Sequence, residues 1–210
     1  MHRPVTALIR PGPVARSADA GEVLFLEGDP CDYVYELRHG IARGVNISLE
    51  GERQIAAFFF AGDQIGLPIA EAYRFTGEAV TELCYVRHAR SHWHEAFISS
   101  CREQGRLLPS ICAEQDPIFR RGIIVGRYGV LARISAFLIS VIDRLPEEGG
   151  VRAFPLPQVD IAAYLATAPE SVCRGFRQLR EMGIIAMPRR DRLCLRDRPR
   201  LEAIASGAQS

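Results

Sequence analysis

The first ninety residues alternate short apolar runs with glycine-containing turns. The runs are rich in aromatic and β-branched side chains, which favour strands over helices, and they occupy residues 22–28, 32–40, 42–49, 53–63 and 78–87. Glycines at positions 28, 40, 51 and 62 punctuate them. Many short strands at such regular spacing predict a barrel or a sandwich.

After residue 90 the apolar spacing changes to three and four, which indicates helices. Ser91 is a suitable N-cap for a short helix over residues 92–101, and a longer helical stretch follows to about Gly126. Within that stretch Pro117 should kink or restart the helix. A seam of mostly apolar or small residues recurs as in a coiled coil, at Leu108, Ile111, Gln115, Ile118, Gly122 and Val125. The seam fits a partner helix or packing on the chain's own barrel.

The last part of the chain predicts two short helices joined by a tight turn. An amphipathic helix over residues 130–145 precedes them, and the first of the pair covers residues 158–165. The second begins at Pro169, which suits the first helical position, and ends at Gly183. Its inward positions are Val172, Phe176 and Leu179. Residues 184–196 then form a hairpin with an arginine-rich turn, so the pattern is a helix-turn-helix with a wing, or an αα-hairpin that only packs.

Charge favours DNA over simple packing. Residues 151–210 hold 10 arginines against 6 acidic residues, whereas residues 1–150 hold 16 against 19, and lysine is absent. A guanidinium matches both guanine edges and phosphate oxygens, although a general preference for arginine also explains the missing lysine. The exposed face of the second helix is expected to carry Glu170, Ser171, Cys173, Arg174 and Arg177.

Each of these residue types suits a particular DNA contact. We expect Arg174 to pair with a guanine and Glu170 to accept from cytosine N4. Arg177, Arg189 and Arg190 are expected to lie on phosphates, which position a protein without reading sequence.

Composition excludes several other classes of protein. A chain of 210 residues with 48% hydrophobic content can bury a core as one domain or two small ones. Its longest apolar runs are shorter than the roughly 20 residues that cross a bilayer, and its N-terminus lacks an apolar signal region of about 7 to 15 residues. We therefore expect a cytoplasmic protein with no membrane span. The cysteines form no C-x-x-C pair, which argues against zinc or a disulfide framework, and they lie at positions 31, 84, 101, 112, 173 and 194.

Five segments together resemble the CRP/FNR superfamily of bacterial transcription regulators, and the FixK-like branch in particular. They are GEVLFLEGDPCDYVYELRHG, FFFAGDQIGLP, YRFTGEAV, IIVGRYGVLARISAFL and PESVCRGFRQL. The resemblance covers about residues 15–205 and implies an α+β chain. Its expected parts are a cyclic-nucleotide-binding-like β-barrel (jelly roll) over residues 1–100, a dimerisation helix over 101–126 and a winged helix-turn-helix over 127–210.

The resemblance also implies how such a protein acts. In this superfamily three residues of the second helix read a palindromic operator: a glutamate, a serine or glycine three positions later, and then an arginine. These positions correspond to Glu170, Cys173 and Arg174 here. It implies a homodimer on double-stranded DNA, with one recognition helix per half-site, that contacts RNA polymerase to activate promoters. A repressor of the same architecture that responds to a small ligand or a redox signal uses the same DNA contacts and stays open.

Three departures from the superfamily pattern bear on the signal. Leu67 and Pro68 replace the glutamate pattern of cyclic-AMP receptors and Phe75 follows Arg74, so we expect no bound nucleotide. No cysteine precedes Cys31, so an N-terminal iron-sulfur cluster is not expected either. Cys173 stands where serine is usual, and an exposed thiol beside an arginine in the N-terminal half of a helix is a candidate for oxidation.

An enzyme is the remaining alternative. A cupin-like barrel needs clustered histidines and a carboxylate on its strands, and the expected strands hold only His39 and His88. His92 and His94 flank Trp93, but a spacing of two puts the rings on different sides of a helix. We expect no catalytic, metal or cofactor site.

Overall fold

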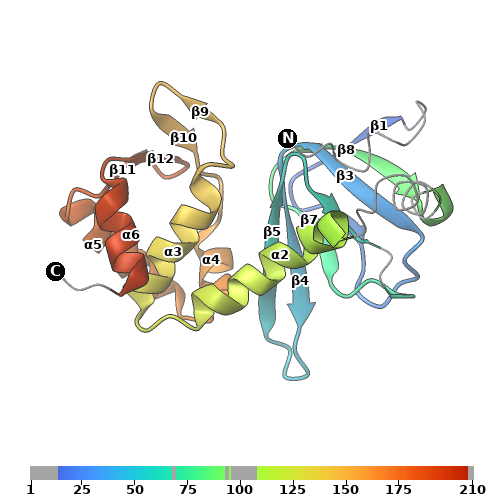
Figure 1. Ribbon diagram of the computed structural model, residues 1–210, viewed down its shortest axis with the longest axis horizontal. Coiled ribbons are helices and arrows are strands. Elements are labelled where there is room, and N and C mark those ends of the chain that lie inside the picture. The colour runs from blue at the N-terminus through green and yellow to red at the C-terminus, as the bar shows by residue number, and fades with distance from the viewer. Residues whose placement is uncertain (1–13, 68–69, 93–94, 96–107, 208–210) are drawn as a thin grey trace. The chain divides into compact units, whose positions relative to one another are not determined.

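The computed structural model describes residues 14–67, 70–92, 95 and 108–207, with side chains between 108 and 125 described from residue 117 onward. The chain divides into two compact units, and Figure 1 labels their elements. The first unit comprises Met1–Asn46 and Ala56–Phe119, and the second comprises Ile47–Ile55 and Arg120–Ser210. The three-part division into residues 1–100, 101–126 and 127–210 stays a prediction.

The first unit contains two four-stranded sheets, ordered β1-β8-β3-β6 and β2-β7-β4-β5. Their strands are β1 (Ala15–Ala18), β2 (Val23–Phe25), β3 (Tyr33–His39), β4 (Ile41–Ile47), β5 (Arg53–Phe60), β6 (Gln64–Ile65), β7 (Thr76–Ala79) and β8 (Leu83–Ala89). The expected run over residues 78–87 is two strands, because the chain turns after Ala79 and the two strands join different sheets. The predicted barrel class is confirmed.

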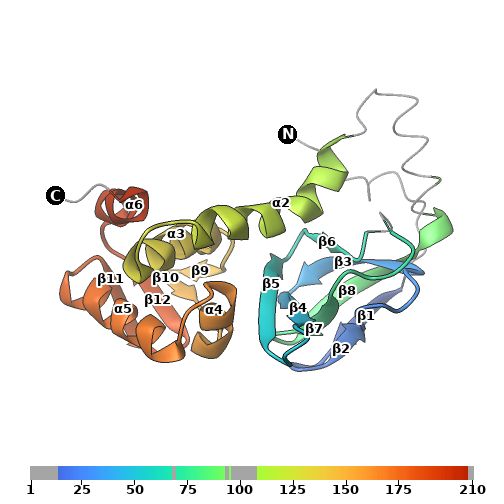
Figure 2. The ribbon, with the colours of Figure 1, turned by 90° about the horizontal axis from the view of Figure 1, so that it is seen from below.

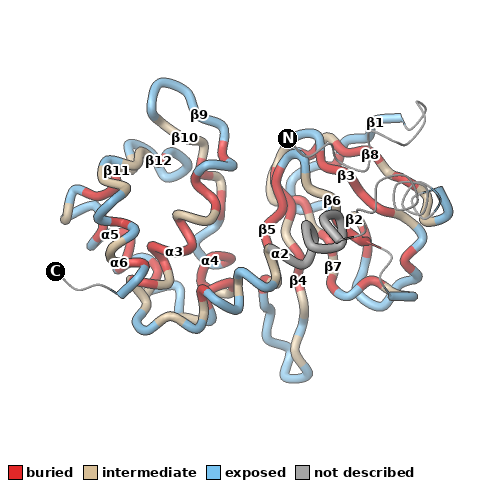
Figure 3. Tube along the Cα trace, in the orientation of Figure 1, coloured by how far each residue is buried: buried red, intermediate tan, exposed pale blue. Residues whose placement is uncertain are grey.

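Aromatic side chains fill the space between these sheets. Along β3 the core side chains Tyr35 and Leu37 are two residues apart, and Val34 and Glu36 on the opposite face of the strand are buried as well. The Phe25 ring stacks on the Tyr73 ring with centroids 4.0 Å apart, and Phe59 stacks on Phe75 at 5.7 Å. Figure 3 shows buried positions recurring along β3, β5 and β8. The barrel interior is a packed core.

The second unit carries helices and a small sheet of order β11-β12-β10-β9. Its elements are α3 (Val130–Ile142), β9 (Glu147–Glu148), β10 (Val151–Ala153), α4 (Gln158–Tyr164), α5 (Pro169–Glu181), β11 (Ile185–Arg189), β12 (Arg192–Leu195) and α6 (Arg198–Ser206). Helix α3 contacts both α5 and α6 (Figure 2). The predicted winged helix-turn-helix is confirmed, and β9, β10 and α6 are additions to it.

Helix α6 has boundary signals that are visible in the sequence. Asp197 caps it by accepting a hydrogen bond from the Arg200 backbone N–H at 3.0 Å, and a proline lies in its first turn. Gly207 ends it in the left-handed region at φ 76°. An acidic N-cap, an early proline and a terminal glycine are the ordinary boundary signals of a helix.

One expectation about the central helices is wrong and another is decided in part. Helix α2 (Leu108–Val125) is one element with Pro117 inside it, so the helix does not restart there, and the alternative of a kink stays a prediction. The chain is already helical at Arg90, so Ser91 is not the N-cap of the short helix that follows the barrel, and most of that helix lies outside the described residues. Among the described helices, none is both long and apolar enough to cross a bilayer.

Helix α5 packs closely on α3 through a glycine. Gly175 is buried, and a Cβ added to it would overlap Cδ1 of Ile134 on α3, whose side chain is fully buried. Glycine weakens a helix interior by about 1 kcal/mol relative to alanine, so its use here indicates that close approach matters more than helix propensity.

This contact predicts a non-additive pair of substitutions. Gly175→Ala should lower the free energy of unfolding by about 1 kcal/mol, because overpacking outweighs the gain in helix propensity. Ile134→Val removes the overlapping Cδ1 and should cost about 0.5 to 1.5 kcal/mol alone. In urea denaturation the double variant should lose about 1 kcal/mol less unfolding free energy than the sum of the losses in the two single variants. Strict additivity would contradict the close approach.

Candidate nucleic-acid interface

One face of α5 is buried and the opposite face is exposed. The buried side chains are Val172, Phe176 and Leu179, which recur three and four apart. Glu170, Cys173, Arg174 and Arg177 are exposed, and Ser171 is half-buried. The structure therefore gathers all five residues expected on this helix on its outer side, although their roles stay predictions.

The charged side chains of this face are held only by weak local contacts. Arg174 Nη2 donates to Ser171 Oγ at 3.2 Å, and Arg177 Nε lies 3.3 Å from the Glu181 carboxylate. Exposed ion pairs of this kind stabilise a protein by about 0 to 1 kcal/mol. Both guanidiniums can therefore exchange these contacts for bases or phosphates at little cost.

The N-terminus of α5 offers an anion little beyond the helix dipole. Ala168 occupies the N-cap position and its side chain makes no capping hydrogen bond. The first amides of a helix lack intrahelical acceptors, and the helix dipole favours negative charge near them. Pro169 has no N–H, however, and the Ser171 N–H donates to the Ala168 carbonyl at 3.0 Å, so few first-turn amides of α5 are left for a phosphate.

The turn before α5 is backbone-strained. Ala166 has φ 50°, the sole positive φ of a non-glycine residue in the described chain, and the Thr167 N–H donates to the Ala162 carbonyl at 3.0 Å. The left-handed region costs a residue with a Cβ about 1 to 2 kcal/mol. The packed helices on either side must maintain this conformation, which sequence reasoning did not identify.

The wing presents arginines at its tip. Strands β11 and β12 pair antiparallel with Arg189 opposite Arg192, and the register shifts between Ala186 and Arg189. Arg189, Arg190 and Arg192 are exposed. The Arg192 Nε lies 3.9 Å from the Asp191 carboxylate, a long contact. The two wing arginines expected from the sequence are thus accessible, and Arg192 adds a third.

Helix α2 exposes a different stripe from the predicted seam. Ile118 is half-buried and packs against the barrel core, Val125 is half-buried, and Gly122 is exposed. The side chains of Leu108 and Ile111 lie outside the described residues. The large exposed side chains are Phe119 and Ile123, which are 69% and 51% exposed and one turn apart. The outward apolar stripe is therefore rotated by about one residue from the seam expected by heptad counting.

The barrel segment that would hold a nucleotide phosphate is turned outward. Arg74 is exposed, while its neighbours Tyr73 and Phe75 are buried in the aromatic core. The Tyr73 hydroxyl donates to the Tyr33 carbonyl at 2.8 Å, and burial raises the pKa of Tyr73 well above its usual value. A neutral, hydrogen-bonded phenol and its stacked ring occupy this part of the interior.

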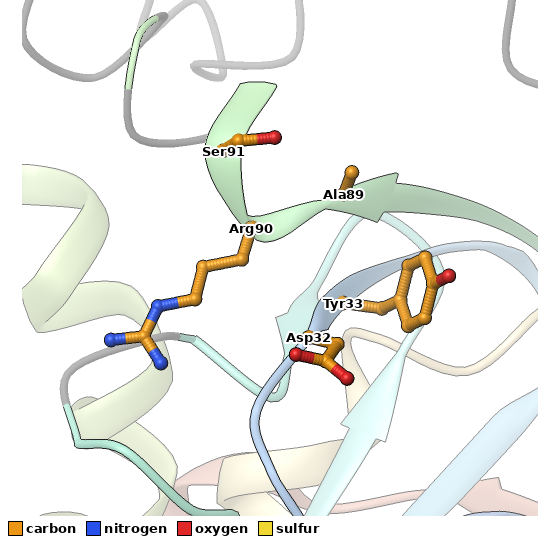
Figure 4. A pocket seen from close by; sticks show the side chains of 5 residues that line it. All are labelled: Asp32, Tyr33, Ala89, Arg90 and Ser91. Carbon is orange, nitrogen blue, oxygen red and sulfur yellow. The ribbon is translucent and has the colours of Figure 1, made fainter.

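An open hollow of about 500 Å³ lies on the surface of the first unit (Figure 4). Its lining residues are Asp32, Tyr33, Ala89, Arg90 and Ser91. The Arg90 guanidinium lies 3.2 Å from the Glu71 carboxylate, and its backbone N–H donates to the Asp32 carbonyl at 2.7 Å. The arginine charge is thus already paired, and we assign the hollow no ligand.

Candidate metal and redox residues are dispersed. Within the described part of the chain, no three or more histidine, cysteine, aspartate or glutamate side chains form a metal-binding group. The Cys31 thiol is buried and donates to the Gly66 carbonyl at 3.2 Å, whereas Cys84, Cys173 and Cys194 are free thiols, of which Cys173 is the exposed one. His92 is exposed, and His94 lies outside the described residues.

Sequence reasoning missed a second set of arginines in this unit, whose partners are backbone carbonyls. Arg121 Nε donates to the Tyr164 carbonyl at 2.9 Å, and Arg133 Nε donates to the Arg127 carbonyl at 3.0 Å. Arg200 Nη1 donates to the Met182 carbonyl, just past α5, at 3.2 Å. No sequence pattern distinguishes these arginines from those expected on DNA, because their partners are backbone atoms brought close only by folding.

Comparison with known proteins follows the same two-unit division. Residues 15–99 match the cyclic nucleotide-binding domain family, and residues 132–204 match the Crp-like helix-turn-helix domain family. The structure of FixK2 from Bradyrhizobium japonicum is similar with a TM-score of 0.86 and 27% identity, over 94% of this chain and 100% of that one.

Curated relatives agree with the structural match. The transcriptional activatory protein AadR of Rhodopseudomonas palustris is 29% identical over 88% of this chain and 78% of its own length. The nitrogen fixation regulation protein FixK of Azorhizobium caulinodans is 31% identical over 96% of this chain and 82% of its own length. Both carry the names of regulators, so the enzyme alternative has no support among them. Similarity of this extent shows that the chain belongs to the CRP/FNR family of DNA-binding transcription regulators, in its FixK-like branch.

Proposed function

We propose that this regulator acts as a homodimer that recognises a palindromic operator and activates transcription. The observation that carries the proposal is the exposed face of α5, where Glu170, Cys173 and Arg174 lie opposite the buried Val172 and Phe176. A recognition helix needs such a face, with short polar residues and a guanidinium near its N-terminal end, to reach base edges in a major groove.

The residues of this face divide into base contacts and phosphate contacts. Arg174 pairs with a guanine, Glu170 accepts from cytosine N4, and the Cys173 thiol makes van der Waals contact with a thymine methyl. Ser171 is near enough to Arg174 to orient its guanidinium, through the 3.2 Å hydrogen bond between them.

Phosphate contacts come from the more distal arginines. Arg177 lies one turn beyond Cys173 on the same face, and Arg189 and Arg190 lie at the exposed end of the wing. These side chains supply affinity that does not depend on sequence and that weakens as salt concentration rises.

Dimerisation uses the outward stripe of α2. Phe119 and Ile123 expose large apolar surfaces one turn apart, and Gly122 between them is exposed with open space around its Cα. The glycine allows two helices to approach closely, and the apolar side chains on either side of it supply the surface that the two helices bury. The half-buried Ile118 and Val125 border this stripe, and Leu108 and Ile111 stay predicted members of the interface.

Activation requires contact with RNA polymerase, and the same DNA contacts would serve a repressor. The names of relatives such as the transcriptional activatory protein AadR and the transcriptional activator protein FnrL support activation. Expression of the intact protein beside a reporter promoter that carries its operator should raise transcription. A fall in transcription would favour the repressor, which responds to a small ligand or a redox signal.

Selection of bound DNA from a random duplex pool tests the proposal directly. The protein should enrich a two-fold symmetric sequence with two half-sites about one helical turn apart, because each protomer places one recognition helix in the groove. Enrichment of single, asymmetric sites, or no enrichment at all, would contradict it.

Two arginine substitutions on the selected operator should separate the two kinds of contact. Arg174→Ala should cost about 1 to 3 kcal/mol of binding free energy and relax discrimination at one guanine per half-site. Arg190→Ala should weaken binding to all sequences alike and reduce the salt slope by about 1. Fluorescence anisotropy titrations over several salt concentrations measure both effects. Equal losses of specificity in the two variants would refute the assigned roles.

A charged residue in the α2 stripe should disrupt the dimer. Ile123→Glu should weaken dimerisation by about 2 kcal/mol or more, because the carboxylate would lose its hydration between two apolar helices. Sedimentation and operator binding at matched concentrations measure the loss. Leu49→Glu is the matched control, since Leu49 is fully exposed on the β4–β5 hairpin, and it should remain dimeric. If the Ile123→Glu variant stays dimeric and binds the operator as the wild type does, this interface is ruled out.

Oxidation of the Cys173 thiol should weaken DNA binding. Low doses of peroxide convert an accessible thiol to a sulfenic acid and higher doses to a sulfinate, an anion that would face phosphates. Operator affinity of the wild type should fall after mild peroxide and recover with a thiol reductant. Cys173→Ser should still bind DNA, and its affinity should not change with peroxide, because a serine hydroxyl is not oxidised under these conditions. If Cys173→Ser loses affinity as the wild type does, the sensitive residue is another cysteine.

A further inference from the structure

Arginines bind the carbonyl groups at the end of α4, the first helix of the helix-turn-helix. Arg121 Nε donates to the Tyr164 carbonyl at 2.9 Å and Arg121 Nη2 to the Ala163 carbonyl at 3.4 Å. Arg133 Nη1 donates to the Leu165 carbonyl, also at 3.4 Å. The last four carbonyls of a helix lack intrahelical donors, so these guanidiniums satisfy three successive acceptors at the C-terminal end of α4.

The same arginines come from the segment that joins α2 to α3. Arg121 lies one turn before the end of α2, and Arg133 lies in the first turn of α3. Arg133 Nε also donates to the Arg127 carbonyl between these helices at 3.0 Å, and Arg127 donates to the Ala205 carbonyl in α6. All these residues belong to the second unit. The end of α2 is thus tied to α4 and α6 by side chain to backbone hydrogen bonds.

Burial makes these contacts more restrictive than exposed ion pairs. Arg121 is half-buried, its guanidinium carbon lies 5.9 Å from the centroid of the Tyr164 ring, and desolvation lowers its pKa. Burial raises the pKa of Tyr164 to about 12, so the phenol is neutral at physiological pH. Arg121 is therefore held in two ways: its charge is attracted to the negative end of the α4 dipole, and its planar guanidinium donates to two carbonyls at once.

The position of these contacts in the chain gives them a functional consequence. The bound carbonyls immediately precede the strained turn at Ala166, which leads into α5. Any tilt of α2 against α4 therefore moves α5 relative to α2. In a dimer paired along α2, that angle determines the distance between the two recognition helices.

From this geometry we infer that Arg121 and Arg133 are positioning residues that set the half-site spacing the dimer accepts. This inference rests on the proposed palindrome-binding dimer. Inserting one base pair displaces a half-site by about 3.4 Å and rotates it by about 35° around the DNA axis, since a turn of 10 to 10.5 base pairs spans roughly 34 to 36 Å. A rigid connection between α2 and α4 rejects that change, and a loosened one tolerates it.

A purely structural role makes a different prediction. If the two arginines only stabilised the fold, their loss would reduce binding to every duplex by the same factor. If they position α5, their loss leaves binding to an isolated half-site unchanged and alters the ratio between spacings. The ratio is therefore the decisive measurement.

The experiment uses the full-length protein and the palindrome obtained by DNA selection. Duplexes with the selected spacing, with one and two base pairs added or removed, and with a single half-site are titrated by fluorescence anisotropy at one salt concentration. The variants are Arg121→Met, Arg133→Met and Arg121→Lys, which keeps the charge but loses the two-carbonyl fork. Arg177→Met is the matched control, because it removes an exposed guanidinium outside this cluster.

Arg121→Met and Arg133→Met should each reduce the preference for the selected spacing over a spacing one base pair longer by about tenfold, within the range of coupling energies that single substitutions alter. Arg121→Lys should lie between Arg121→Met and the wild type, and all three should bind the single half-site as the wild type does. Arg177→Met should weaken binding to every duplex with an unchanged ratio. Melting temperatures identify any variant that fails to fold, and the remaining variants then decide the outcome.

An unchanged spacing ratio in the folded arginine variants overturns the inference and leaves the palindromic dimer intact. Equal losses on all duplexes, including the single half-site, assign the arginines to stability alone and overturn it too. If the wild-type protein selects no palindrome, the proposed function itself fails, and this result is distinguishable because it precedes any comparison of variants.

Discussion

Burial of one face of α5 against α3 is the constraint on which the candidate interface depends. Phe176 and Leu179 are essentially inaccessible, and Gly175 allows the helices to approach within the reach of Ile134. Each fully buried large apolar side chain contributes about 1.5 to 3 kcal/mol, far more than the exposed ion pairs on the opposite side. The packing therefore fixes the rotation of α5 about its axis, and the polar face follows from it.

Arginine serves two physical purposes in the second unit. On α5 and the wing the guanidiniums are exposed and make weak contacts, which leaves them available for an anionic partner. Arg121 and Arg133 instead bind helix-terminal carbonyls, where a planar group with several donors satisfies neighbouring acceptors at once. A lysine would offer one charge centre to those carbonyls, so the absence of lysine from the chain suits both roles.

The sequence was sufficient for features that depend on local periodicity. The positions of Val172, Phe176 and Leu179 predicted the buried face of α5, and the glycine-punctuated runs predicted most strands of the barrel. It was insufficient where tertiary contacts decide. The run over residues 78–87 proved to be two strands in different sheets, and heptad spacing left open whether Ile118 faces a partner helix or the barrel core, against which it packs. Carbonyl partners of arginines have no sequence signature at all.

The register of α2 shows why periodicity alone could not assign that seam to a partner helix or to the chain's own barrel. A helix that packs on its own chain and on a second copy needs two apolar stripes, and both repeat with spacings of three and four. In α2 the inward contact is made by Ile118, while Phe119 and Ile123 remain exposed. Leucine, isoleucine and phenylalanine satisfy either stripe, so the sequence cannot distinguish them, whereas exposure in the folded chain does. Ile123 of the outward stripe and Arg121, which donates to the Tyr164 carbonyl of α4, both lie in the part of α2 that belongs to the second unit. Pairing along the stripe would therefore position the recognition helix of each copy without any further contact.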